Sequence, residues 1–289
     1  STLGTPNRQG FDEWFGYLNQ RRAHSFFPTF IWLNEGRFDL PGNSNGKKQQ
    51  YTHDLFTGFA LSFIRENKDK PFFLYLPYTV PHSRFEIPDL GPYEKKEWPE
   101  KSKVYAAMIT RMDAHIGYIM KLLKELKIDE KTIVFFCSDN GAANRYEGLF
   151  DSSGPLRGRK RDMYEGGLRT PMIVRWPNRV PSNQTSEALW SFTDFLPTAA
   201  DLANIKPPEQ LDGISVLPTL LGQKQATNER FLYWEFFEGG FQQAVRWDKW
   251  KFIRRQKDEL LELYNLDDDV GEENNLATTQ SGIVAKFLE

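Results

Sequence analysis

Asp139 and Asn140 follow a run of β-branched and aromatic residues at 132–137 after a single serine, Ser138, and Gly141 comes next. A continuous apolar run of this length is typical of a strand buried on both faces, as in the middle of a parallel sheet. Ligands collect at the carboxyl ends of such strands, and a carboxylate and an amide offer the oxygen atoms that Ca²⁺ or Mg²⁺ prefers. The sequence therefore predicts a divalent-cation site at Asp139 and Asn140, with a simple polar turn as the alternative.

The four histidines divide into two pairs. His82 follows a second strand-like run at 72–77, so its imidazole is predicted to lie on the same sheet edge as the cation site. His24 lies in an aromatic loop, where both a packing role and a substrate contact are open. His53 and His115 fall on predicted helices and are expected to be structural. His82 and His24 are therefore the histidines predicted to take part in function.

A basic run at 156–161, LRGRKR, precedes the glycine-rich segment YEGGLRTP at 164–171. Such a run can be a nucleic-acid patch, a solvated surface loop, or a loop that presents one or two cations to an anionic substrate. No basic stripe extends it, and it leaves the predicted sheet just after the Asp-Asn pair. We therefore favour the third interpretation.

The composition excludes several classes of protein. The 289 residues carry a net charge of −2 with acids and bases interspersed, so no global field favours nucleic acid or an anionic membrane. No segment has the length and apolarity of a membrane span, and the first residues lack a signal-peptide pattern. One cysteine excludes an intramolecular disulfide. Because Ser1 is not methionine, we expect the chain to begin after a processing site or within a gene.

Strand-like and helix-like segments alternate as far as residue 222. This alternation predicts an α/β fold, a mostly parallel sheet sandwiched by helices. Helices are expected at about 54–67, 101–126 and 193–204, strands at 72–77, 132–137 and 172–176, and a long structured loop at 1–50. Short runs at 231–236, 243–247, 250–254 and 260–266 predict a small antiparallel sheet, and a helix begins near 277. Two domains are predicted, 1–222 and 223–289.

Six motifs occur in the order known from one enzyme family. They are YLPYTVPH at 75–82, MDAHIG at 112–117, SDNG at 138–141, LRGRKRDMYEGGLRTP at 156–171, LDGISVLPTLLG at 211–222 and ELYNLDDDVGEENNLA at 262–277. Together they resemble the type I sulfatases of the alkaline phosphatase superfamily. The resemblance implies that Asp139 and Asn140 are two ligands of a divalent cation, usually calcium. It also implies that His82 and Lys160 contact the sulfate or its bridging oxygen.

The resemblance further implies a formylglycine nucleophile, which sulfatases make from the first residue of a C/S-x-P-x-R motif. We expect this chain to be the C-terminal portion of such a protein, without that motif and without two further aspartate ligands and a second sulfate-binding lysine. Cys137 is not expected to be the formylglycine residue, because it lies within a predicted strand. The isolated chain is therefore expected to be inactive.

The function implied by the resemblance is hydrolysis of a small-molecule or glycan sulfate ester by S–O cleavage, in the periplasm or outside the cell. One alternative is a phosphoester or phosphonate hydrolase of the same superfamily. The other is a non-catalytic carbohydrate-binding fragment.

Overall fold

The computed structural model describes residues 3–143, 149–225, 230–256 and 261–288. The chain divides into two compact units, residues 1–132 and residues 133–289. Within the described residues, no helix is both long enough and apolar enough to cross a membrane.

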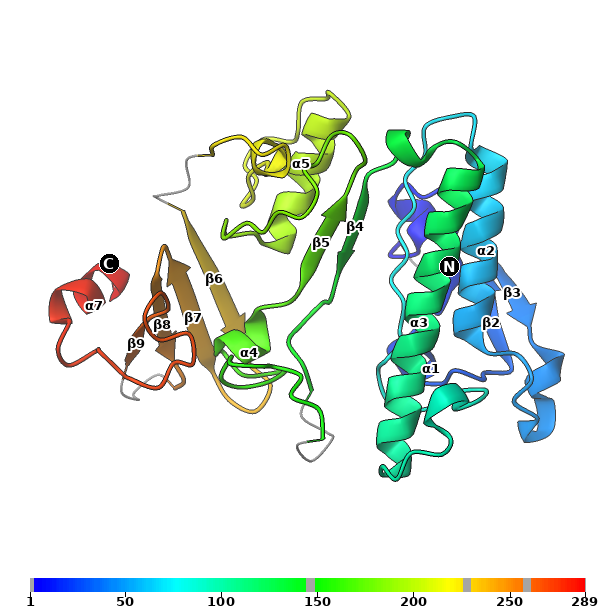
Figure 1. Cartoon of the computed structure of the whole chain (residues 1–289), viewed down its shortest axis with the longest axis horizontal. Coiled ribbons are helices and arrows are strands. Elements are labelled where there is room, and N and C mark those ends of the chain that lie inside the picture. The colour runs from blue at the N-terminus through cyan, green and yellow to red at the C-terminus, as the bar shows by residue number, and fades with distance from the viewer. Residues whose placement is uncertain (1–2, 144–148, 226–229, 257–260, 289) are drawn as a thin grey trace. The chain divides into compact units, whose positions relative to one another are not determined.

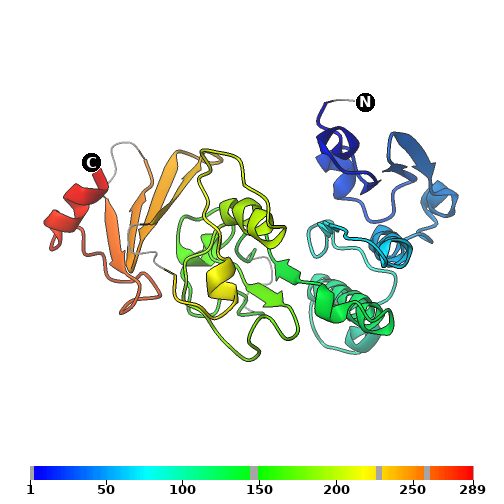
Figure 2. The ribbon, with the colours of Figure 1, turned by 90° about the horizontal axis from the view of Figure 1, so that it is seen from above.

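The first unit has three layers, in which α2 lies between a small sheet and α3 (Figures 1 and 2). The sheet is antiparallel in the order β1-β2-β3. Its strands are β1 (Phe15–Gly16), β2 (Phe30–Leu33) and β3 (Gly36–Asp39). The helices are α1 (Gln20–Ala23), α2 (Thr52–Asn67) and α3 (Glu100–Glu125). Short 3₁₀ helices occur at Pro6–Gln9, Pro41–Gly46, Gly91–Tyr93 and Asp129–Lys131.

Apolar spacing explains why these layers form. Phe56, Ala60 and Ile64 recur every four residues and are buried on one stripe of α2. The Phe15 ring of β1 meets the Phe56 ring edge-on at a centroid distance of 5.7 Å. On α3, Met108 is fully buried in a cluster with aromatic side chains of the first 51 residues. The sheet and α3 are thus held to α2 by side chains that the helical period places on its faces.

The second unit contains a two-stranded ladder, short helices and a four-stranded antiparallel sheet in the order β6-β7-β8-β9 (Figure 1). The ladder pairs β4 (Val134–Cys137) with β5 (Met172–Arg175). The sheet comprises β6 (Phe231–Phe236), β7 (Gln242–Trp247), β8 (Trp250–Arg254) and β9 (Glu262–Asn265). The helices are α4 (Glu165–Leu168), the 3₁₀ turn Phe192–Asp194, α5 (Phe195–Leu202), α6 (Leu217–Leu220) and α7 (Ser281–Leu288).

The C-terminal sheet and the terminal helix confirm the sequence prediction. Asp248 has φ 51° in the turn between β7 and β8, a left-handed conformation that Asp tolerates in tight hairpins. Helix α7 packs on the sheet through Phe287, whose ring stacks on Phe252 with centroids 5.2 Å apart. The helices expected at about 54–67, 101–126 and 193–204 are also present, with shifted ends. The predicted domain boundary at residue 222 stays a prediction.

The predicted mostly parallel sheet is wrong for the described residues, because every strand pair there is antiparallel. Strand β5 pairs with β4 in the register Val134↔Arg175. A parallel pair needs a crossover that carries the chain back to the start of the first strand. Here the intervening loop instead folds against the carboxyl end of β4, where the Gly141 N–H donates to Gly167 O at 2.9 Å. Strand β5 therefore begins beside the end of β4 and runs the other way.

Three further expectations differ from the structure. All four residues of β4 are half-buried, so the strand is not buried on both faces. Residues 72–77 form no strand, since none of the described strands pairs with them. Their exposure alternates, with Phe73 at 57% and Tyr75 at 64%. The segment 1–50, expected to be a loop, contains the strands β1 to β3.

Candidate functional site

The turn after β4 and the loop that carries Lys160 are joined by backbone hydrogen bonds. The Lys160 N–H donates to Ala142 O at 2.8 Å, and the Gly141 N–H donates to Gly167 O at 2.9 Å. The predicted residues Asp139, Asn140 and Lys160 therefore belong to one loop cluster at the carboxyl end of β4.

Three glycines make this close approach possible. A Cβ on Gly141 would lie 2.0 Å from Gly166 O, and one on Gly166 would lie 2.4 Å from Gly158 O. A Cβ on Gly167 would lie 2.1 Å from Asp162 O. Real Cβ atoms do not approach backbone oxygens so closely, so only glycine fits at these positions. The glycines of the SDNG and YEGG motifs thus fix the distance between the turn and the loop.

The side chains of the cluster differ in their surroundings. Asp139 is exposed, whereas Asn140 and Lys160 are half-buried. The Asn140 side chain donates to Gly141 O at 3.1 Å through its Nδ2 atom. Within the described residues, the Asp139 carboxylate and the Lys160 ammonium make no hydrogen bond or ion pair. A carboxylate and an ammonium are thus available to a ligand.

The other cations of the basic run have separate roles. Arg157 donates to Glu272 O and, at 3.2 Å, to the Tyr264 hydroxyl. Arg161 pairs with Glu238 at 2.6 Å on the surface. Arg157 and Arg161 are therefore engaged with different acidic or hydroxyl partners, so the residues of this run do not act as one basic patch.

His24 and His82 meet in the first unit, with ring centroids 4.7 Å apart. The Arg84 N–H donates to His24 O at 3.2 Å, which holds the segment after His82 against the His24 loop. His82 is exposed, and its Nδ1 atom lies 2.7 Å from Ser83 O, a contact that requires a proton on Nδ1. In the neutral ring Nε2 is then the open acceptor. The predicted convergence of His82 with Asp139, Asn140 and Lys160 involves residues of both units and stays a prediction.

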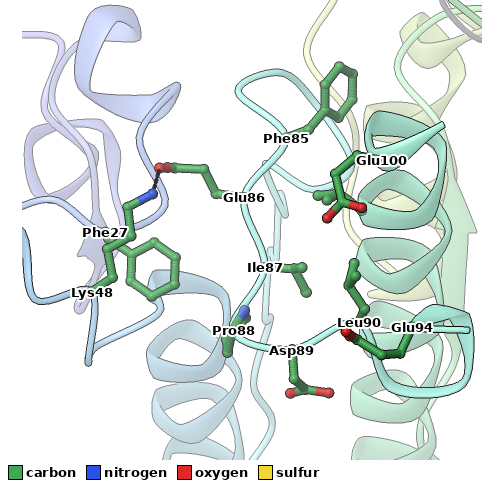
Figure 3. A pocket seen from close by; sticks show the side chains of 11 residues that line it. Phe27, Lys48, Phe85, Glu86, Ile87, Pro88, Asp89, Leu90, Glu94 and Glu100 are labelled. Carbon is green, nitrogen blue, oxygen red and sulfur yellow. Dashed lines mark hydrogen bonds and ion pairs between the residues drawn. The ribbon is translucent and has the colours of Figure 1, made fainter.

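A cavity of about 320 Å³ lies in the first unit and was not expected from the sequence (Figure 3). Its wall carries four carboxylates, Glu86, Asp89, Glu94 and Glu100, together with Phe27, Phe85, Lys48 and four apolar or proline residues. The Lys48 ammonium pairs with Glu86 at 2.8 Å. Most of the residues that line the cavity follow His82 in sequence, but the acidic wall does not suit the anionic group of a sulfate ester.

His53 and His115 are structural, as expected. Their rings stack between α2 and α3 with centroids 4.8 Å apart and planes at 9°. Burial lowers the pKa of His53 to about 3, and the neighbouring His115 and Arg111 lower this pKa further while Asp54 opposes them. A neutral ring in a helix interface is a packing group rather than a site residue.

Asp139 and Asn140 do not by themselves fit a complete calcium site. The described residues hold no group of three or more His, Cys, Asp or Glu side chains arranged to bind a metal. Ca²⁺ takes six to eight oxygen ligands. A calcium ion at this position would therefore need ligands beyond Asp139 and Asn140.

The expectation that the chain lacks a C/S-x-P-x-R pattern is wrong, because residues 153–157 read S-G-P-L-R. This match has a structural role in the loop. The Ser153 hydroxyl donates to Gly158 O at 3.3 Å, and Arg157 is bonded to Glu272 and Tyr264. Cys137 is no better as a nucleophile, since burial raises the pKa of its thiol and the Asp139 charge raises this pKa further.

Sequence reasoning missed three buried charged residues that link the Lys160 loop to the C-terminal sheet. Lys251 and Glu272 are fully buried and Glu165 nearly so. The motifs at 156–171 and 262–277 contain both glutamates, but neither motif shows that their side chains are buried together.

A sequence model described as Sulfatase matches residues 3–205. A second, described as N-sulphoglucosamine sulphohydrolase, C-terminal, matches residues 158–286. The crystal structure of Ps i-CgsB in complex with k-i-k-neocarrahexaose has a TM-score of 0.85 at 26% identity, covering 99% of this chain and 66% of that chain.

Two curated relatives agree with these matches. N-acetylgalactosamine-6-sulfatase of Canis lupus familiaris is 33% identical over 244 residues, covering 79% of this chain and 45% of that protein. The uncharacterized sulfatase YdeN of Escherichia coli (strain K12) is 32% identical over 267 residues, covering 88% of this chain and 45% of that protein. The chain thus spans less than half the length of these relatives. Since the first family model covers more than half of the chain, the chain belongs to the sulfatase family.

Proposed function

We propose that this chain contributes to the active site of a hydrolase that cleaves the S–O bond of sulfate monoesters. The observation that carries the proposal is the glycine-locked contact between the Asp139-Asn140 turn and the Lys160 loop. It presents a carboxylate, an amide and an ammonium on one loop cluster, and within the described residues the Lys160 ammonium has no ion-pair partner. Family membership supports sulfate as the group that this cluster binds.

The proposed chemistry follows from the charge of the substrate. A sulfate monoester carries one delocalised negative charge, and S–O cleavage releases a basic alkoxide as the leaving group. Catalysis therefore needs a cation near the sulfate oxygens and an acid near the leaving oxygen. Lys160 supplies the cation. His82 or Lys160 supplies the proton, and His82 suits this role when its open Nε2 atom is protonated.

In the whole protein, formylglycine would supply the nucleophile and a calcium ion would neutralise the attacked group. Asp139 and Asn140 would be two of the oxygen ligands of that ion. Neither Cys137 nor Ser153 replaces the nucleophile, because burial raises the pKa of the Cys137 thiol and the Ser153 hydroxyl donates to Gly158 O within the loop. We therefore propose that these 289 residues alone have no turnover.

The proposed substrate class is a sulfated sugar or a small sulfate ester. A relative is named for N-acetylgalactosamine 6-sulfate chemistry, and a structural neighbour was solved with a neocarrahexaose. His24 lies against His82 and is the proposed additional substrate contact.

The test compares three substitutions in the whole protein with an aryl sulfate as substrate. Lys160→Ala is expected to lower kcat/KM by about 10²-fold or more, as the loss of a charge-stabilising group does. Arg159→Ala and Arg161→Ala are matched controls on either side and are expected to change it by no more than a few-fold. Equal losses for all three would favour a diffuse basic patch and contradict the proposal.

The same protein preparation can distinguish a sulfatase from the competing phosphoester or phosphonate hydrolase. A sulfatase is expected to show a higher kcat/KM on an aryl sulfate than on the matching aryl phosphate. The reverse order, lost in the Lys160→Ala variant, would assign the site to phosphoryl chemistry instead.

A further inference from the structure

Three buried charged side chains form a cluster between α4 and the C-terminal sheet. The Lys251 ammonium of β8 lies 2.8 Å from a Glu165 carboxylate oxygen and 3.8 Å from one of Glu272. The exposed fractions are 0% for Lys251, 0% for Glu272 and 6% for Glu165. Arg246 adds a second cation, 3.5 Å from Glu165.

Glu272 holds both ends of the loop that carries Lys160. At one end its carboxylate accepts a hydrogen bond from the Glu165 N–H at 2.7 Å. At the other end its backbone carbonyl accepts one from the Arg157 guanidinium, which also lies 4.0 Å over the Tyr164 ring. The Gly166 N–H donates to Arg157 O at 2.7 Å and closes the loop. Lys160 lies between these two fixed ends.

We infer that Glu272, with Lys251 and Arg157, positions Lys160 for the sulfate group. The inference rests on the proposed function, and it assigns the C-terminal sheet the task of fixing the loop. Glu272 acts through the backbone of Glu165, and the loop in turn places the Lys160 N–H on Ala142 O beside Asn140.

A purely stabilising role does not account for this arrangement. Buried ion pairs are commonly no more stable than apolar residues of the same volume, because the charges lose their hydration. Burial raises the pKa of Glu272 to about 7, although Lys251 opposes the shift. Its backbone also has φ 53°, a conformation that non-glycine residues rarely adopt. Such costs are typical of groups kept for geometry.

The first experiment measures amide exchange by mass spectrometry in the 289-residue chain. Glu272→Ala removes the acceptor of the Glu165 N–H and is expected to accelerate exchange of the Lys160 and Gly166 amides about tenfold, as expected for a lost hydrogen bond. Peptides from β6 and β7 are expected to keep their rates. Glu272→Gln retains an oxygen acceptor and is expected to restore most of the protection. Glu273→Ala, at the exposed neighbouring position, is the matched control.

Unchanged loop exchange in Glu272→Ala would overturn the inference, and so would equal acceleration throughout residues 133–256. Failure of Glu272→Gln to restore protection would also overturn it. If Glu272→Ala does not fold, Arg157→Ala gives the second measurement, because it releases the other end of the loop. Normal protection of the Lys160 amide in that variant would contradict the inference.

The second experiment is a double-mutant cycle in the whole protein with an aryl sulfate. Glu272→Ala is expected to lower kcat/KM about tenfold when Lys160 is present, and to have no further effect in the Lys160→Ala background. Losses that multiply would mean that Glu272 acts independently of Lys160. If Lys160→Ala alone has no effect, the proposed function fails, whereas the amide-exchange result still decides whether Glu272 holds the loop.

Discussion

The first unit buries neutral polar rings, whereas the second buries charges. Between α2 and α3, His53 and His115 stack with planes only 9° apart, and within the described residues neither ring nitrogen of His53 has a hydrogen-bond partner. Between α4 and β8, Lys251 and Glu165 form a buried ion pair. The first interface is shaped by packing, and the second by directional contacts.

Burial favours the neutral form of an ionisable group in both units, but the consequences for pH are opposite. His53 is a base, and its pKa is lowered to about 3. Glu272 is an acid, and its pKa is raised to about 7. Acid is therefore expected to weaken the first unit, and neutral pH to weaken the interactions around Glu272 in the second.

The largest effect is expected from removal of the buried cation in the second unit. Lys251→Met leaves the Glu165 and Glu272 carboxylates without the Lys251 ammonium. Removing one partner of a buried ion pair lowers the free energy of unfolding by about 3–5 kcal/mol. Urea-dependent amide exchange, measured separately in peptides from each unit, is expected to show the loss only after residue 132. Lys224→Met, at an exposed position of the same unit, is the control. A loss below about 1 kcal/mol would show that the ion pair contributes little.

Acid is expected to destabilise the first unit through His53. Its pKa is 6.5 when unfolded and about 3 when folded, so the stability from the neutral ring is present above pH 6.5 and is lost as the pH falls towards 3. The slope is up to about 1.4 kcal/mol per pH unit. His53→Phe is expected to reduce this slope of stability against pH. His82→Phe, at an exposed position, is the control and is expected to leave the slope as it is. Equal slopes in both variants would contradict the assignment.

Glu272 is expected to give a smaller effect of opposite sign in the second unit. Its pKa is 4.5 when unfolded and about 7 when folded, so its contribution is fully present below pH 4.5 and is lost as the pH rises to 7. The slope has the same upper limit, about 1.4 kcal/mol per pH unit, over a narrower range. Amide exchange from pH 4.5 to 7, corrected for intrinsic rates, is expected to lose this dependence in Glu272→Gln. Its persistence would point to another group.

The smallest effect is expected from Gly117→Ala in the first unit, and Gly141 of the second unit gives the contrast. Gly117 lies within α3, and no atom lies within 4 Å of an added Cβ. Gly117→Ala is therefore expected to stabilise the first unit by up to about 1 kcal/mol in urea unfolding. In the second unit, Gly141→Ala would place a Cβ 2.0 Å from Gly166 O and is expected to destabilise. Stabilisation by both would show that the loop contact is adaptable.

Local periodicity was enough to predict α2, α3 and the C-terminal sheet. It also placed Asp139 and Lys160 on the connection that follows β4, where the Lys160 N–H donates to Ala142 O. The direction of the chain after β4 could not be predicted in this way. It depends on contacts among Gly141, Gly166 and Gly167 that are distant in sequence and have no period.

Lys251 shows a second limit of sequence reasoning. In β8 three consecutive residues, Lys251, Phe252 and Ile253, are buried, so the alternation expected of a strand with one solvent face does not hold. The charge of Lys251 predicts exposure. Only the approach of Glu165 and Glu272 from other segments explains its burial.

The segment at 72–77 is expected to promote association of the chain in concentrated solution. Its backbone has no ladder partner among the described residues, and it exposes Phe73 and Tyr75 on alternate positions. A segment of high β-propensity that has no ladder partner and exposes aromatic side chains can pair with a second chain. Preparations of the 289-residue chain are therefore expected to become turbid as the protein concentration rises. The Phe73→Lys variant is expected to stay clear.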